Sequence, residues 1–237
     1  MKLLAFESSA KAASTAILSD GNLLAEYTQN SGQTHSRTLM EMAKNMLSGC
    51  GLTPQDIDAV AVAEGPGSFT GIRVGMACAK GFAWGRQLPL YGVSTLAAMV
   101  CGAACADGVY CACMDARKGQ IYNAVFTYSA GVSARASEDR AIAISELEQE
   151  LASANAPIYL VGDGAKLVFD TLSESGLPLV LLPEQLRQQR AAGVALVAME
   201  KISAGESGNA AALTPNYLRQ AQAERTRQNN KDFYLKK

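Results

Sequence analysis

Three carboxylates stand where an expected strand gives way to a turn of small residues: Glu7, Asp115 and Asp163. In a two-lobed nucleotide-binding protein, carboxylates at such turns face the cleft and hold a metal–phosphate group through water. Aspartate beside glycine or alanine also favours a turn without any ligand, because its side chain hydrogen-bonds the local backbone. We prefer this second explanation for Asp163 and leave both open for Glu7 and Asp115.

The segment GPGSFTGIR, residues 65–73, is the most specific pattern in the sequence. It follows a buried strand and opens a helix, and such a turn can direct backbone N–H groups toward an anion. It matches neither the Walker pattern, which needs Lys after its last glycine, nor the dinucleotide pattern, which needs glycine where Thr70 stands. An anion-binding turn and a tight turn with positive φ at Gly65 or Gly67 fit the pattern equally well.

His35 is the only histidine, and it precedes an expected helix. A metal site with two histidines is therefore impossible, and the sequence contains no G-x-S-x-G nucleophile pattern. The six cysteines form no Cys-x-x-Cys pair, so we expect buried, reduced thiols and not a metal or redox site. We expect His35 to cap the helix or to make a surface contact.

The elements that position these residues belong to a chain of 237 residues, of which 49% are hydrophobic and 18% charged. Such a chain can bury a large core, and its net charge of −1 argues against a free-standing nucleic-acid binder held by bulk positive charge. No apolar stretch is long enough to span a membrane, and the start MKLLAFESS is no secretory signal. We therefore expect a cytoplasmic protein with no membrane contact.

The end of the chain differs in charge from the rest. From residue 219 onward it carries six basic and two acidic residues, whereas the preceding residues carry a net charge of −5. A solvated terminus is the expected explanation. A contact to RNA or to an acidic partner is the alternative.

Strands alternate with helices along the chain, which predicts an α/β fold. A capping box formed by Ser145 and Glu148 predicts one helix start. Apolar spacing and turn residues predict five further helices, over 36–48, from about 71 to 85, over 92–105, over 166–173 and from Pro183 to about Ser203.

The two halves of the chain resemble each other faintly. Each has a short strand that ends in a carboxylate, Glu7 or Asp115, followed by a turn with a lysine and a second strand. This similarity suggests two lobes built on one plan. We place the N-terminal lobe at residues 1–106, and the C-terminal lobe with the basic tail at residues 107–237.

Two of the expected helices have features of a contact with another chain. Gly71, Gly75, Ala79 and Ala83 lie four residues apart and form a stripe without large side chains, which lets another helix come close. The helix over 36–48 contains several methionines, whose flexible side chains suit partner surfaces. Packing inside the lobe is the alternative explanation for the stripe. If the two helices lie side by side, a partner can complete a four-helix contact.

Five segments carry a resemblance to a known family: GPGSFTGIR, HSRTLM (35–40), GVSTL (92–96), MDARKGQIYNA (114–124) and PNYLR (215–219). They resemble the TsaB (YeaZ) family, and the matches cover nearly the whole chain. The resemblance implies the two-lobed actin-like, Hsp70 and sugar-kinase fold, which is ribonuclease H-like, with duplicated mixed sheets. It also implies a part in making threonylcarbamoyladenosine at position 37 of tRNAs that read ANN codons.

The family resemblance implies a non-catalytic accessory subunit. Such a subunit pairs with the transferase TsaD, shares an assembly with the ATPase TsaE, and reaches tRNA only through that complex. A homodimer is expected when the chain is alone. The family's pairing surface matches the first two helices, which predicts the interface residues Leu39, Met42, Met46, Gly71, Gly75, Cys78, Ala79 and Phe82. We expect Gly75→Leu to prevent pairing while the monomer stays folded.

The resemblance also places a degenerate nucleotide cleft at Glu7, Ser8, Ser9, Gly65, Gly67 and Asp115. Active members of this fold group usually begin the first phosphate turn with Asp and include a glycine, whereas this turn contains a longer carboxylate and no glycine. Both differences weaken metal–ATP binding. We expect no tightly bound cofactor and no metal, only weak ATP or ADP with Mg²⁺ at the cleft or in the complex.

Two other functions are alternatives to the accessory role. An ATP-dependent phosphotransferase of the same fold would use Glu7 and Asp115, and Mg–ATP binding that is lost in Glu7→Ala would indicate it. A peptidase is the weakest alternative, because the chain has one histidine and no nucleophile motif.

Overall fold

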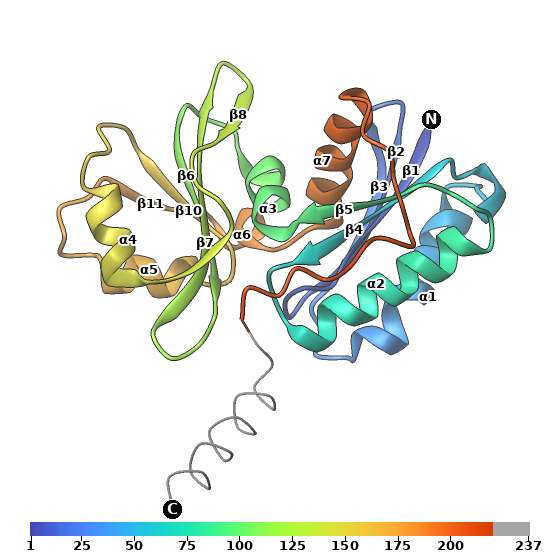
Figure 1. The fold of residues 1–237 in the computed structure, drawn as a ribbon, viewed down its shortest axis with the longest axis horizontal. Coiled ribbons are helices and arrows are strands. Elements are labelled where there is room, and N and C mark those ends of the chain that lie inside the picture. Colours follow the sequence, from blue (N-terminus) through green and yellow to red (C-terminus); the bar gives the residue numbers. More distant parts are fainter. Residues whose placement is uncertain (220–237) are drawn as a thin grey trace, which may run out of the picture.

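The structure, a computed structural model, describes residues 1–219. These residues form two lobes, each built around one sheet (Figure 1). Apart from Arg219, the basic tail lies outside the described residues. Within residues 1–219, none of the helices is long and apolar enough to cross a membrane.

The first lobe has a five-stranded sheet in the order β3-β2-β1-β4-β5. Its first three strands are antiparallel neighbours, and β1, β4 and β5 run parallel. Asp20 and Gly21 both have positive φ and form the hairpin turn between the second and third strands. The strand bounds are β1 Lys2–Glu7, β2 Ala13–Ser19, β3 Asn22–Gln29, β4 Ala59–Gly65 and β5 Leu90–Ser94.

Helices cover both faces of this sheet. On one face, α1 (His35–Gly49) and α2 (Phe69–Trp84) pack their buried side chains on β1 and β4. On the other face, α3 (Thr95–Ala103) and α7 (Ala191–Ser203) do the same with mostly small side chains. A short 3₁₀ helix, Pro54–Asp56, precedes β4. Burial on both faces explains why β1 and β4 contain almost uninterrupted apolar residues.

The second lobe has a six-stranded sheet in the order β11-β10-β6-β7-β8, with β9 also paired to β7. Strands β6 and β7 form a hairpin, and β10 and β11 continue the sheet in parallel with β6. The strand bounds are β6 Gly108–Asp115, β7 Gln120–Ser129, β8 Val132–Arg135, β9 Arg140–Ala143, β10 Ile158–Val161 and β11 Leu179–Leu181. The helices are α4 Ile144–Leu151, α5 Ala165–Thr171 and α6 Glu184–Arg187.

Helices α3 and α7 join the two lobes. Leu96, Met99 and Val100 of α3 pack in the core beneath the second sheet, whereas Ala98 packs with α7 under the first. The chain passes to the second lobe after α3 and returns to the first with α7. Helix α7 therefore belongs to the first lobe, although the predicted boundary between residues 106 and 107 assigned it to the second.

Three predicted helix boundaries are wrong. The segment 92–105 begins as strand β5, and its helix starts only after Ser94, whose hydroxyl accepts the Ala97 N–H. The helix near Ser145 begins at Ile144, directly after β9, without a side-chain cap. The long helix predicted from Pro183 to Ser203 is interrupted between α6 and α7.

The start of α7 is set by side chains from the sheet of the first lobe. The backbone N–H groups of Ala191 and Ala192 donate to Ser14 Oγ (3.1 Å) and Glu26 Oε1 (2.9 Å). The Glu26 carboxylate also forms an ion pair with Arg190. Side chains of β2 and β3 thus satisfy the first N–H groups of α7, which fixes the start of that helix at residue 191.

Candidate functional site

Glu7 ends β1 where the two lobes meet, and its side chain is fully buried. Its Oε1 accepts the Ser9 N–H at 2.5 Å. Among residues 1–219, neither Glu7 Oε2 nor Ser9 Oγ has a hydrogen-bond partner, although both atoms are buried. Burial raises the pKa of Glu7 to about 7, against the opposing effect of hydrogen bonds from Ser9 and Ser8. Near neutral pH this carboxyl is therefore only partly ionised.

Two carboxylates of the second lobe face the same junction. Asp163 follows β10 and accepts a hydrogen bond from Gln189 Nε2 at 3.0 Å. Desolvation raises the pKa of Asp163, and the charge of Asp115 acts in the same direction. Asp115 ends β6, and its Oδ1 accepts the Arg117 N–H at 2.7 Å. The structure thus brings Glu7, Asp115 and Asp163 to one region.

The residues present do not fit a tightly held Mg–nucleotide. Glu7 is fully buried, so its carboxyl group does not reach a hydrated cation between the lobes. Among residues 1–219, no three His, Cys, Asp or Glu side chains are grouped closely enough to hold a metal ion. The turn that contains Ser8 and Ser9 also lacks the glycine that lets backbone approach a phosphate closely.

The glycine-rich segment packs against that same turn. Gly65 has φ +121°, and a methyl group there would lie 2.5 Å from the Asn216 carbonyl oxygen. A methyl group at Gly67 would lie 2.5 Å from the Ser9 carbonyl oxygen, and the Ser68 N–H donates to that oxygen at 2.7 Å. The glycines of this turn therefore allow close contact with the backbone of Ser9 and Asn216, and the Ser68 N–H binds protein and not an anion. Of the two explanations that the sequence left open, these contacts favour the tight structural turn.

Most of the predicted interface residues lie inside the first lobe. Six of the eight are buried, namely Leu39, Met42, Met46, Gly71, Gly75 and Ala79, and the other two, Cys78 and Phe82, are half-buried. A side chain added at Gly75 would overlap the Ser8 hydroxyl and contact Val62. The expectation that Gly75→Leu leaves the monomer folded is therefore wrong, because that side of α2 packs on β1 and β4.

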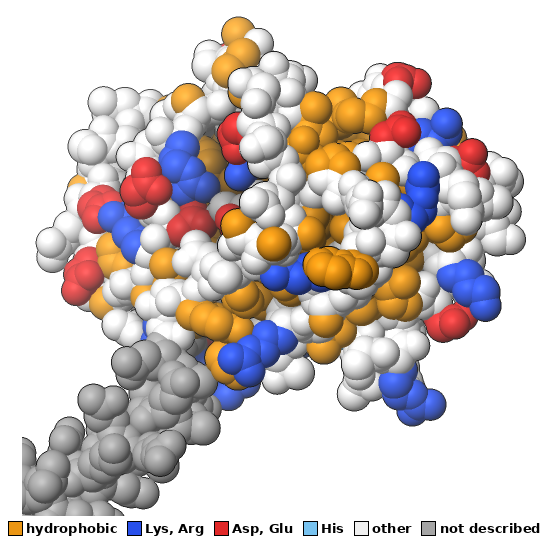
Figure 2. Space-filling view, turned by 45° about the vertical axis from the view of Figure 1, so that its right-hand side comes forward, with side chains coloured by type: hydrophobic (Ala, Val, Ile, Leu, Met, Phe, Trp, Pro, Cys, Tyr) orange, Lys and Arg blue, Asp and Glu red, His pale blue; other side chains and the backbone are white. Residues whose placement is uncertain are grey.

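The exposed sides of α1 and α2 contain different residues. Trp84 is 79% exposed and Met40 is 40% exposed. Ala77 and Gly81 are also exposed, and no atom of residues 1–219 lies within 4 Å of a methyl group added at Gly81. We call Met40, Ala77, Gly81 and Trp84 the outer helical face. Figure 2 shows hydrophobic side chains gathered over the first lobe. The spacing of residues 77, 81 and 84 indicates a second side of α2 with small or apolar residues. The prediction used the other side, which contains Gly71, Gly75 and Ala79.

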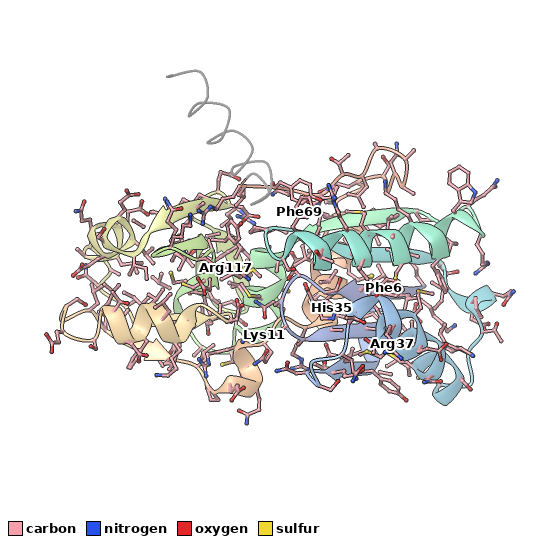
Figure 3. All side chains as sticks on the ribbon, turned by 90° about the horizontal axis from the view of Figure 1, so that it is seen from below. Phe6, Lys11, His35, Arg37, Phe69 and Arg117 are labelled. Atoms are coloured by element: carbon pink, nitrogen blue, oxygen red, sulfur yellow. The ribbon has the colours of Figure 1, made fainter. Side chains whose placement is uncertain are left out.

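His35 begins α1, but it does not cap the helix. Its Nε2 lies 2.8 Å from the Ala10 carbonyl oxygen, which ties the start of α1 to the turn after β1 (Figure 3). Among residues 1–219, its buried Nδ1 has no partner. Thr34 occupies the N-cap position without a side-chain hydrogen bond. The histidine thus holds the start of α1 against the turn that follows β1.

The segment 215–219 connects the lobes. The Asn216 N–H donates to the Glu64 carbonyl oxygen at 2.7 Å. The Tyr217 ring stacks on Phe69, with ring centroids 4.9 Å apart. Arg219 donates to the carbonyl oxygens of Ala116 and Arg117 in the second lobe. The segment therefore joins the glycine-rich turn to the β6–β7 turn, a connection that the sequence analysis missed.

Comparisons with known proteins agree on one group. The family model described as "TsaD: tRNA N6-adenosine threonylcarbamoyltransferase" matches residues 22–226. The Bacillus subtilis tRNA threonylcarbamoyladenosine biosynthesis protein TsaB is 29% identical over 228 residues, covering 94% of this chain and 96% of that protein. The Escherichia coli protein of the same name is 34% identical over 190 residues, covering 77% and 82%.

Solved structures agree with these relatives. A Pseudomonas aeruginosa protein described as similar to peptidase YEAZ has a TM-score of 0.78 and 26% identity, covering 92% of this chain and 99% of its own. A Thermus thermophilus ROK hexokinase, at 12% identity and a TM-score of 0.50, covers 86% of this chain and all of its own, and shares the fold alone. The two-lobed, ribonuclease H-like fold of the actin, Hsp70 and sugar-kinase group is thereby confirmed. The chain belongs to the TsaB (YeaZ) family of tRNA threonylcarbamoyladenosine biosynthesis proteins.

Proposed function

We propose that this chain is a non-catalytic accessory subunit that pairs with TsaD and is required for threonylcarbamoyl transfer to adenosine 37 of tRNAs reading ANN codons. TsaE belongs to the same assembly. The observation that carries the proposal is the outer helical face, an apolar surface with two small residues and an exposed tryptophan on a family member. Apolar surface of this kind marks a protein contact.

The chemistry of the lobe junction supports a role without catalysis. A general acid or base must reach the reacting group, but the Glu7 carboxyl is fully buried. His35 Nε2 is engaged by the Ala10 carbonyl group. Of the two carboxylates that an ATP-dependent phosphotransferase would use, Glu7 is therefore poorly placed for that reaction, which favours the accessory role.

We infer that α1 and α2 pair with TsaD through the outer helical face. A glycine inside a helix costs about 1 kcal/mol relative to alanine. Gly81 has open space beside it, so no contact within the described chain compensates for that cost. Close approach of a partner helix provides the compensation. The same surface pairs two copies of this chain when TsaD is absent.

The pairing surface is tested by adding bulk to it. Gly81→Leu projects into open space, so the variant is expected to fold and to lose co-purification with TsaD. Gln149→Leu adds bulk on an exposed position of α4 in the second lobe and is the matched control. Sedimentation velocity of each variant alone reports the homodimer. Normal pairing of Gly81→Leu with TsaD would reject this surface.

The requirement in the reaction is tested by reconstitution. TsaC, the enzyme that makes threonylcarbamoyl-adenylate from threonine, bicarbonate and ATP, is mixed with these substrates, TsaD, TsaE and unmodified tRNA. The modified nucleoside is quantified by mass spectrometry with and without this protein. We expect product only when the protein is present, and little product with Gly81→Leu. Equal product without the protein would reject the accessory role.

A further inference from the structure

One edge of the molecule combines aromatic rings with arginine and lysine side chains. We name it the basic–aromatic edge, and it consists of Phe69, Arg73, Arg117, Lys118, Tyr217 and Arg219. Its parts come from the start of α2, the β6–β7 turn and the segment 215–219. Figure 3 shows Phe69 and Arg117 near the junction of the lobes, with Arg37 farther away.

The aromatic part of this edge is a preformed stack. The guanidinium carbon of Arg73 lies 3.8 Å from the Phe69 ring centroid, and the Tyr217 ring stacks on Phe69 at an interplanar angle of 29°. Tyr217 is 39% exposed and Arg73 is exposed. Rings that are held flat and remain accessible provide platforms on which unpaired bases can stack.

The cationic part lies beside the stack. Arg117 and Lys118 are exposed at the tip of the β6–β7 turn, where both have positive φ. Within the described chain, Arg73, Arg117, Lys118 and Arg219 take part in no ion pair. Asp115 is an acidic neighbour on the same turn, and it accepts a hydrogen bond from the Arg117 backbone. The local charge of the edge is thus positive.

This positive charge stands out because the rest of the chain is acidic. Residues 1–218 carry a net charge of −5, and this edge is positive within that background. The 18 residues that follow Arg219 in the sequence add five basic and two acidic side chains. Positive charge beside stacking rings suits a nucleic acid, because its phosphates are negatively charged and its unpaired bases are flat.

We propose that the basic–aromatic edge binds unpaired nucleotides of RNA directly. Bases stack on Tyr217, while Arg73, Arg117 and Lys118 contact the phosphates. The choice of RNA rests on the proposed function in tRNA modification. The inference goes beyond that function, because contact with tRNA would then not occur through the partner subunits alone.

The test is fluorescence anisotropy of a fluorescein-labelled anticodon stem–loop RNA with the full-length protein in the absence of TsaD. Tyr217→Ala is expected to weaken binding about tenfold, and Tyr217→Phe, which keeps the ring, is expected to retain it. Lys118→Asp is expected to weaken binding and to lower the slope of log Kd against log salt by about 1, measured between about 50 and 200 mM salt.

Arg37→Asp is the matched control for Lys118→Asp. Both change the net charge equally, but Arg37 lies on α1 away from the edge. Aspartate suits the first turn of a helix and also tolerates positive φ, so both variants are expected to fold. Circular dichroism and sedimentation velocity verify folding and oligomeric state. Equal RNA affinity of Lys118→Asp and Arg37→Asp would overturn the proposal.

Two further outcomes would also overturn the proposal. One is the absence of RNA binding at about 50 mM salt. The other is displacement of the RNA by polyglutamate of matched charge as effectively as by unlabelled RNA, which would indicate an acidic protein partner instead. Failure here is distinct from failure of the accessory role, because the reconstitution measures nucleoside formation and this assay measures RNA binding without TsaD.

Discussion

Arg73 donates a hydrogen bond from Nε to the hydroxyl of Tyr217 over 2.7 Å, although the two residues lie 144 positions apart in the chain. Arg73 belongs to the glycine-rich segment and Tyr217 to the PNYLR segment, two of the five segments that carry the family resemblance. Their contact brings both segments to the place where the lobes meet. The consequence is that the last described residues influence how the second lobe is held against the first.

Arg219→Ala is expected to loosen the β6–β7 turn. Arg219 donates to carbonyl groups on the far side of the junction, and each hydrogen bond from a charged group contributes about 1.5–3 kcal/mol when buried and less here, where the side chain is half-buried. Hydrogen exchange measured by mass spectrometry should show faster exchange in peptides that contain residues 115–120. Arg187→Ala, on α6, is the control. Unchanged exchange in Arg219→Ala would contradict a connection between the lobes.

Two glycines of α2 are expected to respond in opposite directions to alanine. A methyl group at Gly71 would overlap the Ser8 carbonyl oxygen, which is backbone and cannot move away cheaply. Gly71→Ala should therefore destabilise the protein by about 1–3 kcal/mol. In the part of the chain that the structure describes, no atom lies within 4 Å of a methyl group added at Gly81, so Gly81→Ala should stabilise the protein by about 1 kcal/mol.

Urea denaturation of the two glycine variants measures this difference directly, because both substitutions add the same group to the same helix. The comparison separates the inner side of α2, which packs within the lobe, from the outer side. A loss of stability in Gly81→Ala as large as that in Gly71→Ala would show that the outer side is not free in the folded chain.

Glu7→Gln is expected to change how stability depends on pH. Burial raises the pKa of Glu7 to about 7 from 4.5, so the folded state keeps a proton that the unfolded state releases. The folded protein therefore loses stability as pH rises from about 4.5 to about 7, by at most about 3 kcal/mol. Glutamine cannot ionise, so the variant should be more stable than the original protein at about pH 8 and similar to it at about pH 4.

Urea denaturation across this pH range tests the effect of Glu7. Glu184→Gln, an exposed carboxylate on α6, is the control and should leave the pH dependence unchanged. Asp163 contributes in the same direction, because its pKa is also raised. Glu7→Gln should therefore reduce the dependence without abolishing it. Parallel curves for Glu7→Gln and the original protein would contradict the burial of a protonated carboxyl.

The sequence predicts the first lobe better than the contacts between the lobes. The apolar spacing of Leu39, Met42 and Met46 predicted helix α1, and all three side chains are buried on the first sheet. The same spacing cannot say whether the sheet or another chain covers them. The residues of the outer helical face were missed for that reason, since local periodicity identifies a buried face but not its neighbour.

The start of α7 shows a second limit of local sequence reasoning. Residues 183–203 are apolar enough to predict one continuous helix, but the break lies where Ser14 and Glu26 accept the first N–H groups. These acceptors come from strands that precede the helix by more than 160 residues. A cap supplied from such a distance leaves no signal beside the helix that it starts.

Glu26→Ala is expected to weaken the attachment of α7 to the rest of the first lobe. Glu26 accepts the Ala192 N–H through one oxygen and pairs with Arg190 through the other, and its side chain is only 7% exposed. Its removal leaves one helix N–H without an acceptor and an arginine without its charge partner. Because Arg190 is 36% exposed and keeps some water, we expect a loss of about 2 kcal/mol.

A double-mutant cycle with Arg190→Ala measures how much of that loss belongs to the ion pair. If Glu26 acts mainly on the backbone of α7, Glu26→Ala should cost nearly as much in the Arg190→Ala background as alone. If the ion pair dominates, the second substitution should cost little. In either case near-ultraviolet circular dichroism and urea denaturation should show a weakened first lobe. No loss of stability in Glu26→Ala would show that α7 is held by its apolar contacts with β1, β2 and α3 alone.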